Sequence, residues 1–398
     1  MLTVSSAVKK LIAQAQPLVD DRRRAGLESV PVTEALGRAL AADIVSAIDV
    51  PPAANSAMDG YAFCAADAAA GKYNLEISQR IPAGTAPAPL QPGTAARIFT
   101  GGEIPAGADT VAMQENCTEA EGWVKTDKKA EAGDNIRARA QDIKAGEVIV
   151  KAGTRLRAQE LGLLSSVGIA RVEVFKPLKV AIFSTGDELV EPGMPLHPGQ
   201  IYNSNRATLI GLIESLGMVP VDLGVVPDRL AATQHVLKKA AMRGDVIISA
   251  GGVSVGEEDY VKTAVEKVGA MAFWKVAIKP GKPLAFGHVE NTPLIGLPGN
   301  PASVFTTFMV LARPFLMACQ GCSEVAARHL KAPAQFAKAG EKRQVYLRGR
   351  LTEEGVEIYP NQSSGVLSSA CWGDVFVVQK TGEPIEVGDL VDVLPYAL

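Results

Sequence analysis

The segment from Pro177 to about Gly321 constrains the fold of this 398-residue chain most, because strand patterns and helix patterns alternate along it. Short apolar runs such as KVAIFST, MVPVDLGVV and DVIISAGG are followed by longer runs such as SNRATLIGLIESLG and RLAATQHVLKKAAMRG. The last run, PASVFTTFMVLARPFLMACQG, is expected to be the closing helix. Alternation of this kind is typical of a doubly wound, mostly parallel sheet. We predict an α/β domain here, with its first helix capped by Ser204 or Asn205.

The chain before this segment has two kinds of pattern. Residues 3–24 and 32–42 have helical periodicity, and DIVSAIDV (43–50) is expected to be a strand. From about residue 71 to 150 the sequence has short strand patterns separated by Pro/Gly turns and no convincing helix, which is typical of a small β domain. Residues 154–174 return to a helix and a strand. We infer that the β domain is inserted into one discontinuous domain.

The C-terminal part, residues 330–398, is again rich in strand patterns, such as QVYLRGRL and VFVVQK, and predicts a small β barrel or sandwich. The fold class is therefore multidomain, α/β plus β. The predicted domains are a discontinuous linking domain (1–48 and 145–177), an inserted β domain (49–144), the αβ domain (178–324) and a C-terminal β barrel (325–398).

Composition narrows the range of partners. Lys and Arg total 40 against 43 acidic residues, and a net charge of −3 argues against a general nucleic-acid binder. The N-terminus resembles an amphipathic helix rather than an export signal, and no run of 18 uncharged apolar residues is present. Cys319 and Cys322 form a single C-x-x-C, which we interpret as ordinary thiols rather than a zinc or redox site. We expect a cytoplasmic protein without nucleic-acid or membrane partners.

Three strand ends within residues 245–301 are the best candidates for a ligand site. One strand pattern runs into Gly251 and Gly252, and two more end in the loops KPGKP and GLPGNP. At the carboxyl ends of parallel strands, glycine lets backbone amides approach a phosphate. The loop Gly251–Gly256 is neither the G-x-G-x-x-G fingerprint nor a P-loop, which disfavours a nicotinamide oxidoreductase. A phosphate cradle with Ser254 as a donor and a tight turn without a ligand are the two interpretations.

Carboxylates follow three of the strand patterns, at Glu188, Asp228 and Asp259. Mg²⁺ takes oxygen ligands and bridges to phosphate, so carboxylates that converge from separate strand ends would suit it. The alternative is that Asp228 and Asp259 cap the helices that follow them. Spacing alone favours neither interpretation.

Three lysines lie in or beside the loop KPGKP. Lys275 stands in an apolar run beside Trp274, where an unpaired ammonium is costly, so we expect an anion or carboxylate partner for it. Lys279 and Lys282 flank a Pro-Gly turn that suits a multiply charged oxyanion, and a solvated loop is the alternative. No Ser-His-Asp or Cys-His arrangement is suggested, so covalent nucleophilic catalysis has little support.

Two segments of the predicted β domain carry further polar residues. Asp59 in NSAMDGYAF precedes a glycine, and a structural turn is the default interpretation. In NIRARAQDI, Arg137 and Arg139 would lie on one face of an extended chain, as on a solvated edge strand.

Eight segments resemble the molybdopterin molybdenumtransferase family, the bacterial MoeA proteins and the E domain of gephyrin. They span nearly the whole chain in the order and spacing of the family. The segments are NSAMDGYA (55–62), FTGGEIPAGAD (99–109), NIRARAQDI (135–143), FSTGDEL (183–189), YNSNR (202–206), SAGGVSVGEEDY (249–260), FWKVAIKPGKP (273–283) and GLPGNP (296–301).

The resemblance implies a Mg²⁺-dependent step of molybdenum cofactor synthesis. Adenylyl-molybdopterin and molybdate would bind, molybdate would enter the dithiolene, and AMP would be released. It also implies an elongated homodimer of four-domain chains, with an αβ domain similar to MogA-type adenylyltransferases and an active cleft shared between the subunits. Contact with a MogA-type adenylyltransferase and with molybdoenzyme chaperones is a further expectation.

The resemblance also assigns roles to residues at matching positions. Those implied to hold the pterin phosphates, the nucleotide and Mg²⁺ are Glu188, Asp228, Asp259, Ser184, Gly251, Gly252, Ser254, Gly256, Pro298 and Pro301. Those implied to bind molybdate or counter substrate charge are Lys275, Lys279, Lys282, Arg348 and Ser369. Those implied to complete the cleft from the second subunit are Asp59, Thr100, Arg137 and Asp142. The catalytic set is Asp59, Asp142, Asp228, Lys275 and Lys279.

The sequence departs from the family in two places. Ala138, Ala140 and Gln141 replace a more basic run, and the loose match at SSGVLSSACWGD does not show whether Ser368 or Ser369 faces the site. An alternative from another class is a scaffold that binds a partner peptide, as the E domain of gephyrin does. No partner-binding segment is identifiable in the sequence, so chemistry is the favoured interpretation.

Overall fold

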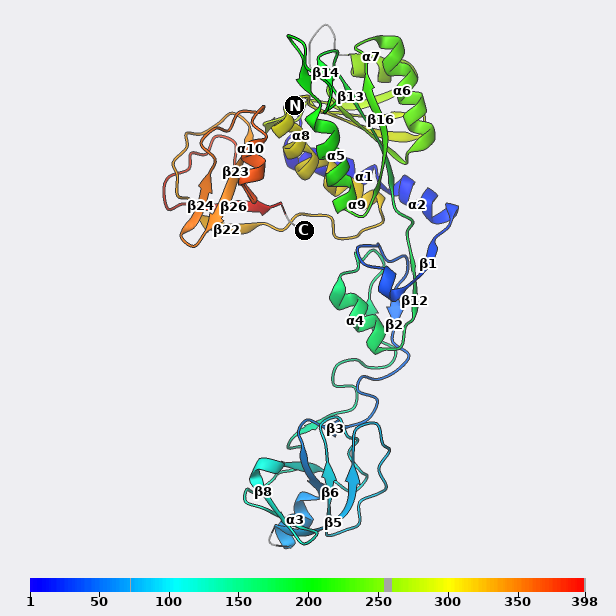
Figure 1. Ribbon diagram of the computed structural model, residues 1–398, viewed down its shortest axis with the longest axis vertical. Helices are drawn as coiled ribbons and strands as arrows, with labels where there is room; N and C mark the ends of the chain where they lie inside the picture. Colours follow the sequence, from blue (N-terminus) through cyan, green and yellow to red (C-terminus); the bar gives the residue numbers. More distant parts are fainter. Residues whose placement is uncertain (72, 254–259, 397–398) are drawn as a thin grey trace.

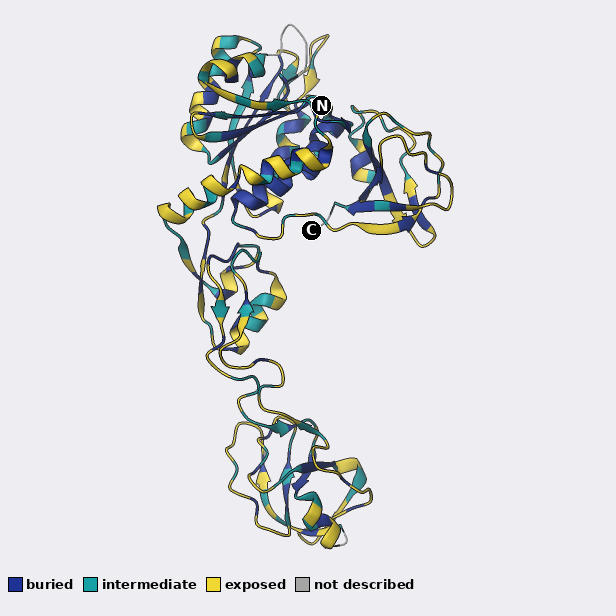
Figure 2. Ribbon diagram, turned by 180° about the vertical axis from the view of Figure 1, so that it is seen from behind, coloured by how far each residue is buried: buried dark blue, intermediate teal, exposed yellow. Residues whose placement is uncertain are grey.

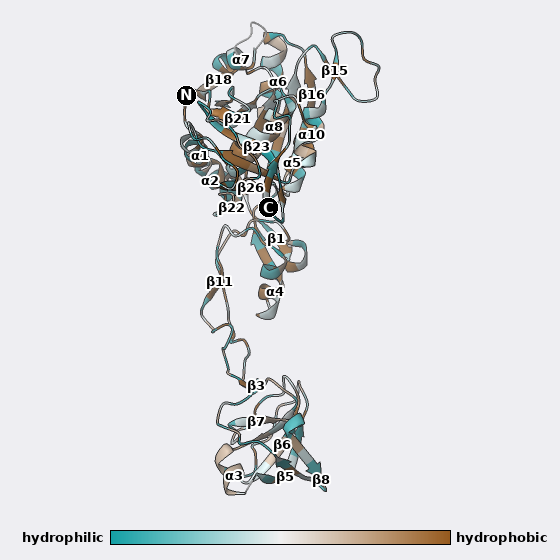
Figure 3. Cartoon of the chain, turned by 90° about the vertical axis from the view of Figure 1, so that its left-hand side faces the viewer, coloured by the Kyte–Doolittle hydropathy of each residue, from teal (hydrophilic) through white to brown (hydrophobic). Residues whose placement is uncertain are grey.

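The computed structural model describes residues 1–71, 73–253 and 260–396. The chain is elongated, with the αβ unit and the C-terminal β unit at one end and the inserted β unit at the other (Figure 1). The segments that link the two ends lie side by side between them (Figures 1 and 3).

The αβ unit is built on one six-stranded sheet with the order β16-β13-β17-β21-β20-β18. Its strands are β13 (Lys179–Thr185), β16 (Val219–Val226), β17 (Val246–Ala250), β18 (Gly269–Trp274), β20 (Ala285–Val289) and β21 (Thr292–Leu297). Strands β16, β13, β17 and β21 are parallel, whereas β20 and β18 are antiparallel at one edge. The prediction of a mostly parallel sheet is confirmed.

Helices cover both faces of this sheet. They are α5 (Ser204–Ser215), α6 (Leu230–Arg243), α7 (Tyr260–Val268), α8 (Pro301–Thr307), the π-helical turn η3 (Phe308–Ala312) and α9 (Arg313–Cys319). Because successive strand residues face opposite sides, Val180 and Ile182 pack in a core with α5, α8 and α9, while Ala181 and Phe183 pack with α6 and α7. This is the doubly wound arrangement. The cap of α5 is Asn203, not Ser204 or Asn205, because the Asn203 side chain accepts a hydrogen bond from the Arg206 amide.

The closing helix runs from Pro301 to Cys319 through the π-helical turn. Its length and hydropathy alone would suffice to cross a membrane, but 94% of its most apolar window is buried inside the protein (Figure 2). The helix therefore behaves as a core helix. Cys319 and Cys322 at its end are buried free thiols, and burial raises the pKa of Cys322 to about 11.

The linking unit is formed by two segments far apart in the sequence. Strand β1 (Glu28–Pro31) pairs with β12 (Arg171–Val174), and β2 (Ile44–Val45) pairs with β11 (Val148–Val150) beside α4 (Ala158–Ser166). The inserted topology expected from the sequence is confirmed. The N-terminal helices α1 (Val4–Ala13) and α2 (Gln16–Ala25) precede it, and α1 packs in the core of the αβ unit.

Two predictions in the linking unit are wrong in extent. Instead of a helix over 32–42, the chain forms only the 3₁₀ turn η1 (Val32–Glu34), because Gly37 has a φ of +76° that ends the helical path. Leu40 then bridges to Val174 as extended chain. The strand expected over 43–50 is limited to β2.

The inserted unit is a six-stranded sheet of order β7-β4-β6-β5-β9-β8 with a core of its own. Its elements are β3 (Asn55–Ser56), β4 (Gly60–Phe63), α3 (Ala65–Ala70), β5 (Asn74–Ile81), β6 (Thr94–Ile98), β7 (Thr110–Met113), η2 (Gln114–Asn116), β8 (Cys117–Ala120), β9 (Trp123–Thr126) and β10 (Ile136–Arg137). The short helix α3 was not anticipated, although its alanine-rich sequence favours a helix.

The C-terminal unit is a β sheet that extends into the αβ unit. Its order is β19-β23-β25-β26-β22, with β24 beside β23. The elements are β19 (Ile278–Lys279), β22 (Leu330–Pro333), β23 (Gln344–Thr352), β24 (Gly355–Ile358), α10 (Ser368–Trp372), β25 (Val375–Gln379) and β26 (Leu390–Pro395). Because β19 belongs to the loop KPGKP, this sheet fixes the position of Lys279.

Candidate functional site

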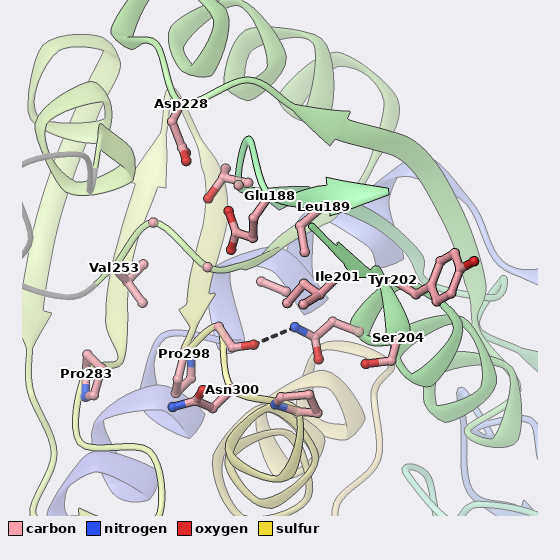
Figure 4. A pocket seen from close by; sticks show the side chains of 18 residues that line it. Glu188, Leu189, Ile201, Tyr202, Ser204, Asp228, Val253, Pro283, Pro298 and Asn300 are labelled. Atoms are coloured by element: carbon pink, nitrogen blue, oxygen red, sulfur yellow. Dashed lines mark hydrogen bonds between the residues drawn. The ribbon is translucent and has the colours of Figure 1, made fainter. Parts of the chain in front are cut away.

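A cavity of about 650 Å³ lies at the carboxyl ends of β13, β16, β17 and β21 (Figure 4). The chain passes from β13 to β16 on one side and then crosses to β17 on the other side, so the cavity lies where the strand order reverses. Ligands of open α/β sheets bind at such points. Of the predicted site residues, those that line the cavity are Glu188, Asp228, Gly251, Gly252, Pro298 and Pro301.

The floor of the cavity is the turn that follows β17. Gly251 and Gly252 have φ values of +95° and +67°, which side-chain-bearing residues rarely adopt. A Cβ atom on Gly251 would lie 2.8 Å from the carbonyl oxygen of Thr185, and one on Gly252 would lie 2.6 Å from Cγ2 of Val261. Both positions therefore require glycine, which the phosphate cradle and the tight turn without a ligand both need. Ser254, Gly256 and Asp259, the remaining predicted residues of this loop, lie outside the described residues.

Two helix N-termini border the same cavity, and the amide of Ala302 in the closing helix is already bonded to the carbonyl oxygen of Ser364. Helix α5 begins at Ser204 and the closing helix begins at Pro301, and both residues line the cavity. Asn205 joins the two by donating a hydrogen bond from Nδ2 to the carbonyl oxygen of Gly299 at 2.7 Å (Figure 4). The positive ends of helix dipoles stabilise bound phosphate or carboxylate groups. This edge of the sheet is therefore suited to an anionic ligand.

Carboxylates line the opposite wall, where Glu188 and Asp228 lie close together (Figure 4). Asp187, which the sequence reasoning missed, holds Asp228 in place. The amide of Asp228 donates to Oδ1 of Asp187 at 3.1 Å, and the amide of Asp187 donates to Oδ2 of Asp228 at 3.3 Å. The adjacent acidic residues of TGDEL were the available signal. Asp228 lies one residue before Arg229, the cap position of α6.

The donor set fits Mg²⁺ in chemistry, because two carboxylates face a cavity that also presents amides for phosphate. Within residues 1–71, 73–253 and 260–396, no group of three or more His, Cys, Asp or Glu side chains is arranged to hold a metal ion. Mg²⁺ commonly keeps several water ligands and binds through one or two carboxylates plus substrate phosphates. The Mg²⁺ site therefore stays a prediction.

An apolar wall, also missed from the sequence, completes the cavity. It is formed by Leu189, Ile201 and Tyr202 of the parallel pair β14 (Leu189–Val190) and β15 (Ile201–Tyr202). The loop between these strands projects from the body of the molecule (Figure 3). Arg206 fastens this wall to the sheet by ion pairs with Glu191 and Asp222. Such a wall suits the flat face of a ring system.

Ser184 does not line the cavity. Its side chain is buried, and its hydroxyl donates to Oδ1 of Asn203 at 3.3 Å. It therefore supports the cap of α5 behind the cavity wall.

Lys275 has a different environment from the one predicted. It is half-buried, and its Nζ lies 4.6 Å from the centroid of the Trp274 ring. No carboxylate among the described residues pairs with Lys275; the indole face stabilises the ammonium and part of the side chain reaches solvent, and an anion as its partner stays a prediction. Trp274 donates from Nε1 to the carbonyl oxygen of Val253 at 2.8 Å, which connects this pair to the glycine turn.

The two lysines that flank the Pro-Gly turn differ from each other. Lys279 donates from Nζ to Oε1 of Glu341 in the C-terminal unit at 2.6 Å, and this pairing holds the pKa of Glu341 below its ordinary value. Lys282 is exposed. Neither lines the cavity, whereas the neighbouring Pro283 does.

Arg348 and Ser369 are joined to each other in the interior of the C-terminal unit. Nε of Arg348 donates to Oγ of Ser369 at 2.9 Å, and Nη2 donates to the carbonyl oxygen of Ser363. Burial lowers the pKa of Arg348. Ser369 is fully buried and Ser368 is exposed, and neither Arg348 nor Ser369 lines the cavity.

Ser364, missed from the sequence, connects the C-terminal unit to the rim of the cavity. Its carbonyl oxygen accepts a hydrogen bond from the Ala302 amide, and its hydroxyl accepts one from Nδ2 of Asn300 at 3.1 Å. The loop that contains Ser363 and Ser364 therefore lies beside the N-terminus of the closing helix.

Asp59, Thr100, Arg137 and Asp142 all belong to the inserted β unit, at the opposite end of the chain from the cavity (Figure 1). Asp59 accepts two hydrogen bonds from Thr100, from its amide and its hydroxyl, which hold the pKa of Asp59 below the ordinary 3.8. Arg137 and Asp142 are exposed, while the neighbouring Arg139 pairs with Asp49. A single chain does not bring these four residues to the cavity.

Comparisons with known proteins agree along the whole chain. Three family models match in succession: the MoeA N-terminal region (domain I and II) at residues 2–168, a probable molybdopterin binding domain at residues 181–318, and the MoeA C-terminal region (domain IV) at residues 330–396. Two crystal structures of MoeA molybdopterin biosynthesis proteins from Pyrococcus horikoshii superpose on the structure of this chain. One has a TM-score of 0.83 at 28% identity over 100% of both chains, and the other 0.76 at 32% identity over 99% of both.

Curated relatives of this chain are named molybdopterin molybdenumtransferase. The molybdopterin molybdenumtransferase of Haemophilus influenzae is 38% identical over 412 aligned residues, which cover 100% of this chain and 99% of the relative. The molybdopterin molybdenumtransferase of a Nostoc species is 40% identical over 306 residues, which cover 75% of this chain and 70% of the relative. The chain therefore belongs to the MoeA family of molybdopterin molybdenumtransferases.

Proposed function

We propose that this chain inserts molybdate into adenylyl-molybdopterin with release of AMP, as a transferase of molybdenum cofactor biosynthesis. The observation that carries the proposal is the cavity at the strand ends, which combines helix N-termini, a glycine turn and two carboxylates within about 650 Å³. A pterin with a pyrophosphate and a nucleotide needs these features together: amides for phosphate, an apolar wall for a ring, and oxygen ligands for a cation.

The described residues have the following roles in the proposed reaction. The amides at the N-terminus of α5 bind phosphate oxygens, the dipole of the closing helix attracts the same negative charge, and Glu188 and Asp228 would hold Mg²⁺. Bound Mg²⁺ supplies neutralisation of phosphate charge. Lys282 and Lys279 attract the molybdate dianion, while Arg348, held by Ser369, adds positive charge beneath the Ser363–Ser364 loop. Electrostatic positioning of this kind needs no covalent nucleophile.

The inserted β unit enters this proposal through a second copy of the chain. Asp59, Thr100, Arg137 and Asp142 complete the cleft from the partner of a homodimer, since in one chain they lie at the far end. Cytoplasmic location and contact with a MogA-type adenylyltransferase and molybdoenzyme chaperones belong to the same proposal. A peptide-binding scaffold is not favoured, because the similar proteins bear the name of an enzyme.

The activity is tested with purified protein, adenylyl-molybdopterin and molybdate, by measuring AMP release and the activation of an apo-molybdoenzyme with and without Mg²⁺. Asp228→Asn is expected to lower turnover by about 10²-fold or more, because it removes a charge beside the cation and phosphate. Asp20→Asn, on the exposed face of α2, is the matched control. Wild-type turnover by Asp228→Asn would remove this carboxylate from the site.

The shared site is tested by mixing two variants. Asp228→Asn and Asp59→Asn each disable one half of the cleft, so a heterodimer of the two has one intact site. Recovery of part of the wild-type activity on mixing is expected. If the mixture stays as weakly active as each variant after confirmed subunit exchange, Asp59 and Asp228 act within the same chain.

A further inference from the structure

Arg313, the first residue of α9, is buried without a partner. Only 7% of its surface is exposed, and its guanidinium makes no hydrogen bond or ion pair with any residue in the described part of the chain. Its Nε is enclosed without an acceptor. Burial, together with the nearby charge of Arg155, lowers the pKa of Arg313 to about 10. A buried guanidinium is strongly unfavourable unless an anion or several acceptors face it.

Arg313 lines a cavity of about 640 Å³ at the junction between the linking unit and the closing helix. Of the residues that the structure describes, four arginines line this cavity, and Glu324 is the one acidic residue that lines it. Arg157 is neutralised by Glu160 at the start of α4, and Arg328 is exposed. Among the described residues, Arg155 donates to two backbone carbonyls, those of Gly37 and Ser215. Arg155 and Arg313 therefore bring two positive charges near each other, and neither forms an ion pair with a described carboxylate.

We propose that this cavity binds a tetrahedral oxyanion of the phosphate class between Arg155 and Arg313, either free phosphate or phosphate on a small organic molecule. Two guanidinium groups match the geometry and the charge of such a dianion, which would also relieve their mutual repulsion. The apolar side chains of Leu36, Met317 and Leu330 line the same cavity and can cover an organic body.

The place of this cavity suggests what binding would do. Arg155 belongs to the linking unit, which leads to the inserted β unit, and Arg313 belongs to the closing helix of the αβ unit. An anion held by both would join the two units at the point where the chain passes between them (Figure 1). The site is separate from the cavity at the strand ends, since the two share no lining residue.

The proposal is tested by isothermal titration of the full-length protein with inorganic phosphate in a buffer free of phosphate and sulfate. We expect saturable binding, weakened by about thirtyfold or more in Arg313→Met and in Arg155→Met, because each removes half of a charged clamp. Arg243→Met, at the exposed end of α6, loses the same charge elsewhere and should bind like wild type. Phenyl phosphate is the second probe: tighter binding than phosphate assigns the apolar walls to an organic body, and equal binding assigns the site to free phosphate.

Thermal unfolding gives an independent readout. Phosphate should raise the Tm of wild type and Arg243→Met and leave that of Arg313→Met unchanged. Without phosphate, Arg313→Met should be at least as stable as wild type, because an unpaired buried charge is gone. Equal phosphate effects in all variants, or none in wild type, would overturn the proposal. A shift of the monomer–dimer equilibrium by Arg313→Met, without any effect of phosphate, would also overturn the proposal. The partner of Arg313 would then be a group of a second copy of the chain.

Discussion

The ammonium of Lys279 is held by the carboxylate of Glu341, from a different unit of the chain, with 2.6 Å between Nζ and Oε1. Both side chains are partly exposed, and they lie beside the cis Lys279–Pro280 bond. A lysine proposed to attract molybdate is thus already paired, and Glu341 competes with the anion for it.

Removing this competitor should strengthen molybdate binding. Glu341→Gln keeps the shape of the side chain and leaves Lys279 free, so we expect molybdate affinity to rise up to about fivefold, the range for a partly exposed ion pair. Lys279→Met should lower it. Equilibrium dialysis with molybdate measures both, with the exposed Glu353→Gln as control. Unchanged affinity in both variants would place Lys279 outside the oxyanion site.

The same pair predicts a pH dependence of stability. Lys279 lowers the pKa of Glu341 from its ordinary 4.5 in the folded protein. The pair therefore stabilises the fold fully above the unfolded-state pKa, and this contribution is lost as the pH falls through the lower folded-state pKa. Urea unfolding of wild type and Glu341→Gln should differ by up to about 1 kcal/mol at pH 7, and this difference should shrink as the pH falls below 4.5 and through the lower folded-state pKa of Glu341. A difference that grows toward acid pH would contradict this assignment.

Gly252 is predicted to tolerate no side chain. Gly252→Ala places a methyl group 2.6 Å from Cγ2 of Val261 at a φ of +67°, so we expect a loss of about 1–3 kcal/mol in the free energy of unfolding. Gly211→Ala in α5 meets nothing within 4 Å and should gain roughly 0.5–1 kcal/mol. Urea denaturation compares the two. If Gly252→Ala is as stable as wild type, the turn is not as tightly packed as described.

Ser369 is predicted to act mainly through Arg348. Ser369→Ala leaves Nε of the buried Arg348 without its acceptor, which should cost about 1–3 kcal/mol of stability. The exposed neighbour Ser368→Ala should change stability by less than about 0.5 kcal/mol. Denaturation and molybdate titration of both variants separate the two roles of Ser369. A loss of molybdate affinity without any loss of stability would show that the hydroxyl contacts the anion directly.

The sequence predicted the regular elements best where the pattern is long and periodic. Strands β13, β16 and β17 and helices α5 and α6 lie close to the expected runs, because burial on a sheet face or a helix face imposes a repeat along the chain. The helix expected over 32–42 failed where one positive φ at Gly37 redirected the backbone. The pairing of Leu40 with Val174 then decided the local structure, and a pairing over that distance leaves no periodic signal.

For the site, the sequence located the strand ends and the glycine turn. It could not show that Asp187 holds Asp228, that Trp274 supports Lys275, or that the β14–β15 pair forms a wall. Each depends on which side chains are brought together by loops whose paths have no repeat. The assignments for the Lys, Arg and Asp residues outside the cavity, and for Mg²⁺, stay predictions.

By itself, the sequence determined the kind of elements, their order along the chain and the family resemblance. Those features depend on residues two to about twenty positions apart, so they can be recognised from periodicity, turn residues and motifs. Only the tertiary structure decided that Lys279 meets Glu341, that Arg348 is buried on Ser369, and that Arg313 is enclosed beside Arg155. These relationships join residues more than twenty positions apart, and packing of whole units, rather than local preference, sets which charges meet and which stay in solvent.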